Sequence, residues 1–182
     1  MRFAILPLVC LIGTAVTTPV TLEARDSAII SYNIKRVSDV LSRLGDHLNN
    51  RGRRYPGTLQ EFIFEALSLN DQLAQELYYG ADDIKRSPKI NDIEALSVGT
   101  MLTPMIRQAR DTTESIMSLK PSIPDAQAKL AIRDSLISVA TQSSSFSDAI
   151  ISKMSTLSAY IGKDMKRQLD SYMDRAISEY KW

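Results

Sequence analysis

The sequence predicts an all-α fold, a bundle of four to five amphipathic helices, and three observations lead to that prediction. Apolar residues recur at spacings of three and four over long stretches of the chain. Capping residues and segments rich in Gly, Pro and Asn separate these stretches. Beyond residue 25, no segment alternates apolar and polar residues at period two for more than a few positions, so strands are not expected.

The first predicted helix starts at Asp26 or Ser27, either of which is a suitable N-cap. A loop should follow it, because the segment 49–57 contains two glycines, a proline and two asparagines. The face of this helix is marked by regularly spaced apolar residues: Ile30, Ile34, Val37, Leu41, Leu44 and Leu48.

Thr58 and Glu61 form a capping box, in which each side chain accepts from the other's backbone amide, and this pair predicts the start of the second helix. Gly80 is expected to end that helix, with the acidic segment 81–83 as a link. Aromatic and leucine pairs make the helix apolar on more than one face, so it is either buried centrally or exposes an adhesive stripe. Its main apolar positions are Leu59, Phe62, Ile63, Ala66, Leu69, Leu73 and Leu77.

A third helix should begin near Asn91 or Asp92, and Pro104 within it is expected to kink or break it. Pro121 and Pro124 bracket the next loop, and Pro124 fits the first turn of a fourth helix. The predicted face of the third helix consists of Ile93, Leu96, Met101, Met105, Ala109, Thr112, Ile116 and Leu119. The fourth carries Ala128, Ile132, Leu136, Val139, Phe146 and Ile150, and a last helix carries Leu157, Ile161, Met165, Leu169, Tyr172, Ala176 and Tyr180.

The N-terminal residues predict export. Arg2 precedes an apolar run over residues 3–12 and then small residues, the order of a secretory signal peptide. We expect a signal peptide over residues 1–17, a short pro-segment over 18–25 and a single helical domain over 26–182. Cys10, the only cysteine, lies in the leader, so the mature protein is expected to be secreted without a disulfide.

Composition excludes several functional classes. The formal charge of +1 gives no positive field for nucleic acid, and no stretch has the length of a transmembrane helix. One cysteine and one histidine cannot build a Cys/His zinc site. His47 is interpreted as a solvent-facing or helix-end residue, and Asp170 with Asp174 as part of a charged helix face. No catalytic residue, metal site or cofactor is therefore predicted.

The chain resembles the fungal family of hydrophobic surface-binding protein A and cell-wall galactomannoproteins. The resemblance rests on the leader 1–8, the pro-segment closed by residues 24–26 and the first helix spacing. It also rests on the motifs Leu102-Thr103-Pro104, residues 112–121 and residues 174–180. It implies a secreted helical bundle without enzymatic activity that adsorbs to hydrophobic surfaces, can recruit secreted hydrolases, and in some members holds fatty acids between helices. The sequence shows no long Ser/Thr-rich tail and no C-terminal hydrophobic anchor segment, so the resemblance does not extend to covalent wall anchoring. It also contains no Asn-x-Ser/Thr sequon, so N-glycans are not expected.

We therefore predict a secreted or cell-wall-associated binding protein that engages a fatty acid or another lipid, or a hydrophobic surface. Flexible methionine side chains can pack around a lipid tail, although a plain core explains them equally well. The alternative is a solidly packed interaction or effector-like protein that binds another protein or a wall glycan. A cavity of roughly 300 Å³ would separate the two. The residues predicted to line it are Leu73, Leu77, Met101, Met105, Phe146, Ile150, Met165 and Leu169.

Overall fold

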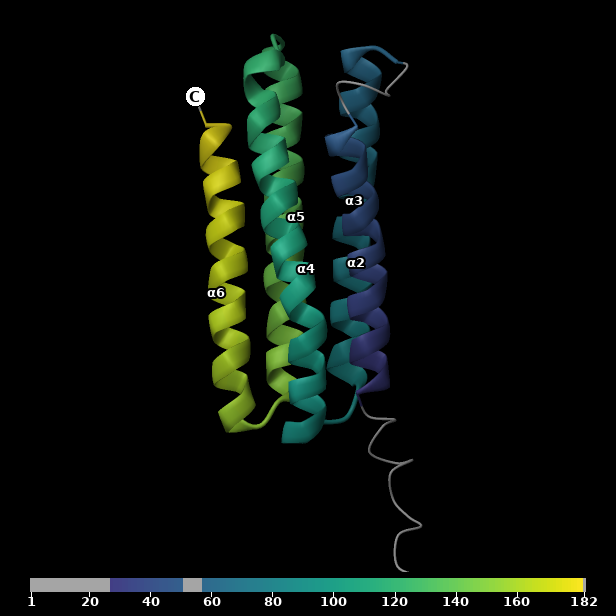
Figure 1. The fold of residues 1–182 in the computed structure, drawn as a ribbon, viewed down its shortest axis with the longest axis vertical. Coiled ribbons are helices and arrows are strands. Elements are labelled where there is room, and N and C mark those ends of the chain that lie inside the picture. The colour runs from purple at the N-terminus through teal and green to yellow at the C-terminus, as the bar shows by residue number, and fades with distance from the viewer. Residues whose placement is uncertain (1–26, 51–56, 182) are drawn as a thin grey trace, which may run out of the picture.

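Long helices run up and down beside one another in the computed structural model, which describes residues 27–50 and 57–181 (Figure 1). Within these residues there is no strand, so the predicted all-α class is confirmed. The predicted signal peptide and pro-segment lie outside the described residues. The helices are α2 (Ala28–Asn49), α3 (Leu59–Arg86), α4 (Asp92–Leu119), α5 (Ala126–Lys153) and α6 (Thr156–Glu179), with a short 3-10 turn, η1 (Lys120–Ser122), after α4.

The helices form a closed ring around the long axis of the bundle. Helix α2 packs against α3 and α4, α5 packs against α3 and α6, and α4 and α6 pack against each other. Each helix therefore has two main neighbours, and no helix occupies the centre. In the view of Figure 1, α2, α4 and α6 run upward while α3 and α5 run downward.

Capping residues start the helices where the sequence places them. Thr58 and Glu61 form the predicted capping box at α3, and Asn91 with Glu94 forms a second at α4. Glu94 is buried, and its carboxylate also accepts the backbone N–H of Ser27 at 3.2 Å, which ties the starts of α2 and α4 together. Helix α5 begins at the N-cap Asp125, so Pro124 precedes the helix instead of lying in its first turn.

The prediction that Gly80 ends the second helix is wrong, and residues 81–83 are helical. Helix α3 continues to Arg86. Gly80 is buried where α3 crosses α5, and a Cβ added there would lie 2.8 Å from Cε2 of Phe146. A glycine that permits close approach of two helices has the same sequence appearance as a C-terminal stop, which explains the error.

Pro104 does not break α4, which is continuous from Asp92 to Leu119. Proline removes the hydrogen bond to the carbonyl four residues earlier, here that of Thr100. Both Pro104 and Thr100 are exposed. Water can therefore solvate the released carbonyl, and the helix continues.

The predicted faces of α4 and α6 are wrong at their N-terminal ends. Ile93 is 80% exposed, Leu96 68%, Leu157 77% and Ile161 54%. On α4 the buried positions are instead Ala95, Val98 and Leu102. The apolar spacing is present, but no helix covers it at this end of the bundle. None of the described helices is long and apolar enough to cross a membrane.

Candidate functional site

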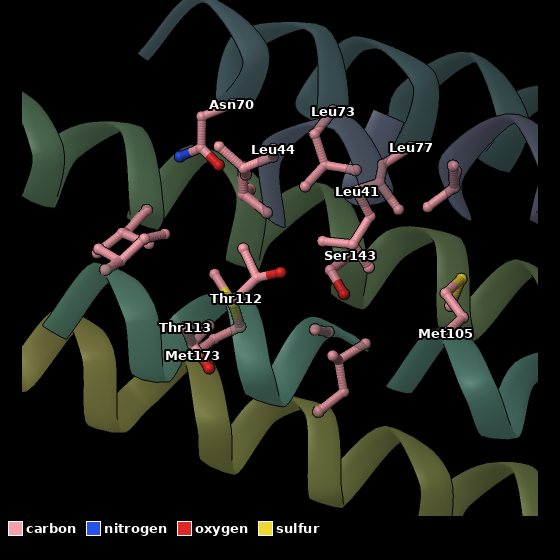
Figure 2. Close-up of a pocket in the computed structure, with 16 residues that line it drawn as sticks. Leu41, Leu44, Asn70, Leu73, Leu77, Met105, Thr112, Thr113, Ser143 and Met173 are labelled. Carbon is pink, nitrogen blue, oxygen red and sulfur yellow. The ribbon is translucent and has the colours of Figure 1, made fainter. Parts of the chain in front are cut away.

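A small cavity lies on the axis of the ring, midway along the bundle. Its volume is about 40 Å³. Figure 2 shows side chains from the surrounding helices pointing into the common space. All five described helices contribute to its wall: Val37, Leu41 and Leu44 from α2, Asn70, Leu73 and Leu77 from α3, Met105, Ala109, Thr112, Thr113 and Ile116 from α4, Leu136, Val139 and Ser143 from α5, and Leu169 and Met173 from α6.

The wall of this central cavity is apolar apart from one amide and three hydroxyl groups. Asn70 donates from Nδ2 to Ser135 Oγ at 2.8 Å, and Thr113 donates from Oγ1 to the carbonyl of Arg110 at 2.8 Å. The side chains of Asn70 and Thr113 are thus engaged within the protein, and no charged residue lines the cavity. The central cavity is therefore suited to hydrocarbon and not to a charged or strongly polar molecule.

Two smaller voids of about 20 Å³ each extend the central cavity along the axis. In the orientation of Figure 1, the upper void shares Leu44, Asn70 and Ile116 with the central cavity. The lower void shares Met105 and Leu169 with it. Because these walls are shared, only one layer of side chains separates neighbouring spaces. The three spaces together are called the axial path below.

The predicted lining residues fall along the lower part of this path, with one exception. Met101 is half-buried and lines none of the three spaces. Leu102, its neighbour, lines the lower void instead. Of the other predicted residues, Leu73, Leu77, Met105 and Leu169 line the central cavity, and Met105, Phe146, Ile150, Met165 and Leu169 line the lower void.

The prediction omitted helix α2 and the polar wall residues. Val37, Leu41 and Leu44 lie on the regular apolar face of α2, so their spacing was a usable signal for a place on the axis. Ser143 was also detectable, because it lies four residues after Val139 on the apolar face of α5. Asn70 had no such signal, since a polar residue beside Leu69 is ordinarily placed on the solvent side.

Lys166 is the one charged residue on the wall of the axial path, where it borders the lower void. Its side chain is 20% exposed, and Nζ lies 2.7 Å from Oδ1 of Asp148. On its outer side, Lys166 also lines a surface groove between α5 and α6 that contains Lys163, Arg167 and Asp170. Lys166 thus joins a charged surface to an apolar interior.

Burial raises the pKa of the Asp170 carboxyl, with the nearby Asp174 and Asp148 raising it further and Lys166 opposing them. The aspartate pair predicted on α6 therefore lies close enough to interact. Asp170 lines this groove, and no histidine or cysteine lines it. In the described part of the chain, no cluster of three or more His, Cys, Asp or Glu residues could hold a metal ion.

His47 is a packing residue. It lies in the last turn of α2, so of the two predicted positions, solvent-facing or helix-end, the structure shows the helix end, with the side chain only 8% exposed. The imidazole stacks on the Phe62 ring with 4.3 Å between centroids, and Nε2 donates to the Phe62 carbonyl at 2.9 Å. These contacts link α2 to α3.

The protein is a helical bundle whose interior contains a series of small apolar spaces separated by side chains. Solved structures share the fold of this chain. Ligand binding domain 1 of the Penicillium marneffei MP1 protein, complexed with arachidonic acids, matches with a TM-score of 0.77 and 14% identity over 87% of this chain and 100% of that domain. AFMP4P in complex with palmitic acid matches with a TM-score of 0.77 and 17% identity over 86% of this chain and 100% of that one.

Ligand binding domain 2 of the same MP1 protein, complexed with multiple arachidonic acids, has a TM-score of 0.74 and 15% identity over 86% of this chain and 96% of that domain. No family model matches the sequence. No curated protein matches it either. The likeness is thus one of fold.

Proposed function

We propose that this protein binds a fatty acid, with the acyl chain along the axial path and the carboxylate near Lys166. The main support for this proposal is the path itself, which has apolar walls from all five described helices and a single cation at its edge. The fold is that of proteins solved with arachidonic and palmitic acid. No histidine lines the path to activate its hydroxyl groups, so binding and not catalysis is its proposed role.

Binding requires the three spaces to merge, because a ligand pocket for such a molecule measures roughly 300 Å³ or more. The voids of about 40, 20 and 20 Å³ are far smaller. The side chains between them include Met105 and Leu169, and methionine in particular changes rotamer at low cost. The acyl chain would take the place of these side chains on the axis, so that apolar contacts are exchanged and not lost.

Lys166 is the proposed partner of the carboxylate. A cation at the edge of an apolar space stabilises an anion whose tail lies inside, and the charge-assisted hydrogen bond fixes the orientation of the ligand. Asp148 holds Nζ at 2.7 Å and competes for it. The fatty acid would therefore share the ammonium group with Asp148.

The test is titration of the purified protein with a fluorescent fatty acid, together with native mass spectrometry for lipids that co-purify. Saturable binding at one or a few sites supports the proposal, and no binding by either method contradicts it. Ala109→Leu places added carbons in the central cavity and should abolish binding, whereas Ala131→Leu adds the same group on an exposed position of α5 and should not. Thermal unfolding of both variants shows that each remains folded.

Lys166→Met tests the orientation. It should weaken fatty-acid binding about tenfold, the effect of losing one charge-assisted hydrogen bond. Binding of the matching fatty alcohol should not change, since the alcohol has no negative charge. Equal effects on acid and alcohol would mean that Lys166 acts through packing.

We further propose that the chain belongs to the fungal hydrophobic surface-binding and galactomannoprotein family, is secreted and resides in or near the cell wall. The leader and the short motifs support this assignment, and so does the shared fold. Adsorption to hydrophobic surfaces, and recruitment of secreted hydrolases to them, would use the exposed apolar side chains of the bundle. Mass spectrometry of the culture medium and wall fraction, with the N-terminus of the recovered protein sequenced, tests secretion and both cleavage sites.

The second candidate function is a solidly packed interaction protein that binds another protein or a wall glycan. The small volume of the axial voids favours it. It predicts that Ala109→Leu has no effect on any binding activity, because the interior would only support the fold.

A further inference from the structure

A groove lies between α4 and α6 at the lower end of the bundle, outside the axial path. Its volume is about 380 Å³, which exceeds the combined volume of the three axial spaces. Leu96 and Leu157, both largely exposed, lie on opposite banks of this groove, and Ile161 and Met154 extend its apolar surface. Such exposure of aliphatic side chains is costly unless something apolar occupies the groove at times.

Gly99 keeps the groove open. It lies in the interior of α4, where glycine destabilises a helix relative to alanine. A Cβ added there would have no heavy atom within 4 Å, so close packing does not require the glycine. This differs from Gly80, which faces the ring of Phe146. The missing side chain at Gly99 has one structural effect, which is to leave space in the groove.

The groove adjoins the axial path. Gly162 and Met165 line both the groove and the lower void. Met105 and Leu169 then line both the lower void and the central cavity. From the surface to the middle of the bundle, the route is therefore closed by two successive sets of side chains, each of which contains a methionine.

The groove between α5 and α6 offers a second route to the lower void, through Ile151 and Lys166. That route is lined by Asp148, Lys163, Arg167 and Asp170, so an acyl chain would have to pass five charged side chains, Lys166 included. In the α4–α6 groove, Asp92 is the one charged residue among the lining side chains. The apolar part of a ligand is better accommodated between α4 and α6.

We propose that the α4–α6 groove is the portal through which the acyl chain of a fatty acid reaches the axial path, and that Met165 is the side chain that must move to admit it. This inference rests on the proposed function. The groove is a passage and not the resting site, since its one charge, Asp92, repels a carboxylate. The carboxylate follows the chain inward until it meets Lys166.

The experiment compares wild type, Gly99→Leu and Ser97→Leu by stopped-flow mixing with a fluorescent fatty acid. Gly99→Leu adds a side chain on the groove wall at a position where the Cβ meets no heavy atom within 4 Å, and leucine is a better helix former than glycine. Ser97→Leu adds the same side chain two residues away, at an exposed position that does not line the groove. Equilibrium titration and thermal unfolding accompany the kinetics.

If the groove is the portal, Gly99→Leu lowers the association and dissociation rates together, each by about tenfold, within the range that mutants of one site span. The dissociation constant stays the same, because the resting site is unchanged, and Ser97→Leu behaves as wild type. Unchanged rates in Gly99→Leu overturn the portal. A raised dissociation constant with an unchanged association rate also overturns it and makes the groove part of the binding site. Absence of fatty-acid binding in wild type itself is a separate result, which contradicts the proposed function and the portal with it.

Discussion

Helices α4 and α6 run side by side along the bundle, yet their contact is closed at the upper end and open at the lower end. At the upper end, Tyr180 is 3% exposed and donates from its hydroxyl to the Ile116 carbonyl at 2.8 Å, and Ala176 is fully buried. At the lower end, Leu96 and Leu157 face solvent across a groove. The amphipathic spacing is the same at both ends, so the difference shows which apolar residues serve packing and which are free for another purpose.

The largest effect should come from breaking the closed end. Tyr180→Ala is expected to lower the free energy of unfolding by about 3 kcal/mol, because it leaves a cavity and an unpaired buried carbonyl at Ile116. Tyr160→Ala is the matched control on α6, the helix that Tyr180 caps, since Tyr160 is 72% exposed near the open end. The control should change stability by no more than about 0.5 kcal/mol. Urea unfolding of both variants measures the difference, and similar losses would contradict it.

Alanine substitutions at two glycines should change the stability by intermediate amounts and in opposite directions. Gly80→Ala should destabilise the protein by about 2 kcal/mol, because the new methyl group meets the Phe146 ring at 2.8 Å. Gly99→Ala should stabilise it by about 0.8 kcal/mol, the helix-propensity difference, because its Cβ enters open space. Thermal unfolding distinguishes the two. Destabilisation by Gly99→Ala would mean that the groove is filled in solution.

The smallest effect concerns Asp170. It follows the buried Leu169 on α6, between the open and the closed ends of the α4–α6 contact. Burial raises its pKa, so the folded protein binds a proton more readily than the unfolded chain. The resulting stability is present at low pH and decreases as pH rises from the ordinary value of 3.8 through the raised pKa. Asp170→Asn should therefore raise the melting temperature slightly at pH 7, and the gain should disappear below pH 3.8.

Exposed Asp71 provides the control for this pH dependence. Asp71→Asn should leave the melting temperature nearly unchanged at both pH values. A gain for Asp170→Asn that persists in acid would contradict the assignment to burial of the charge.

The sequence predicted the helices well because their signals are local. The capping box at Thr58 and the apolar spacing on α2 and α5 depend on neighbours within a few residues. Gly80 was wrongly predicted to end a helix, because the contact that requires a glycine there is with Phe146, which lies on another helix. Leu96 and Leu157 were misplaced because periodicity identifies an apolar face but not whether a partner covers it.

The candidate site was predictable only in part for the same reason. Leu73, Met105 and Leu169 were assigned to a common interior from helix faces, and the structure places them on the axis. The volume between them depends on how five helices pack, which no local pattern contains. Lys166 had no signal either, since its place at the edge of the lower void follows from the ring and not from its own helix.

A ring of five helices with no helix at its centre also affects how such proteins can evolve. The helices hold one another through their flanks, so residues on the axis are free to change size while neighbouring contacts persist. Under the proposed function, exchanges among leucine, methionine and alanine at positions such as Met105, Leu169 or Met173 would change the length of the ligand that fits.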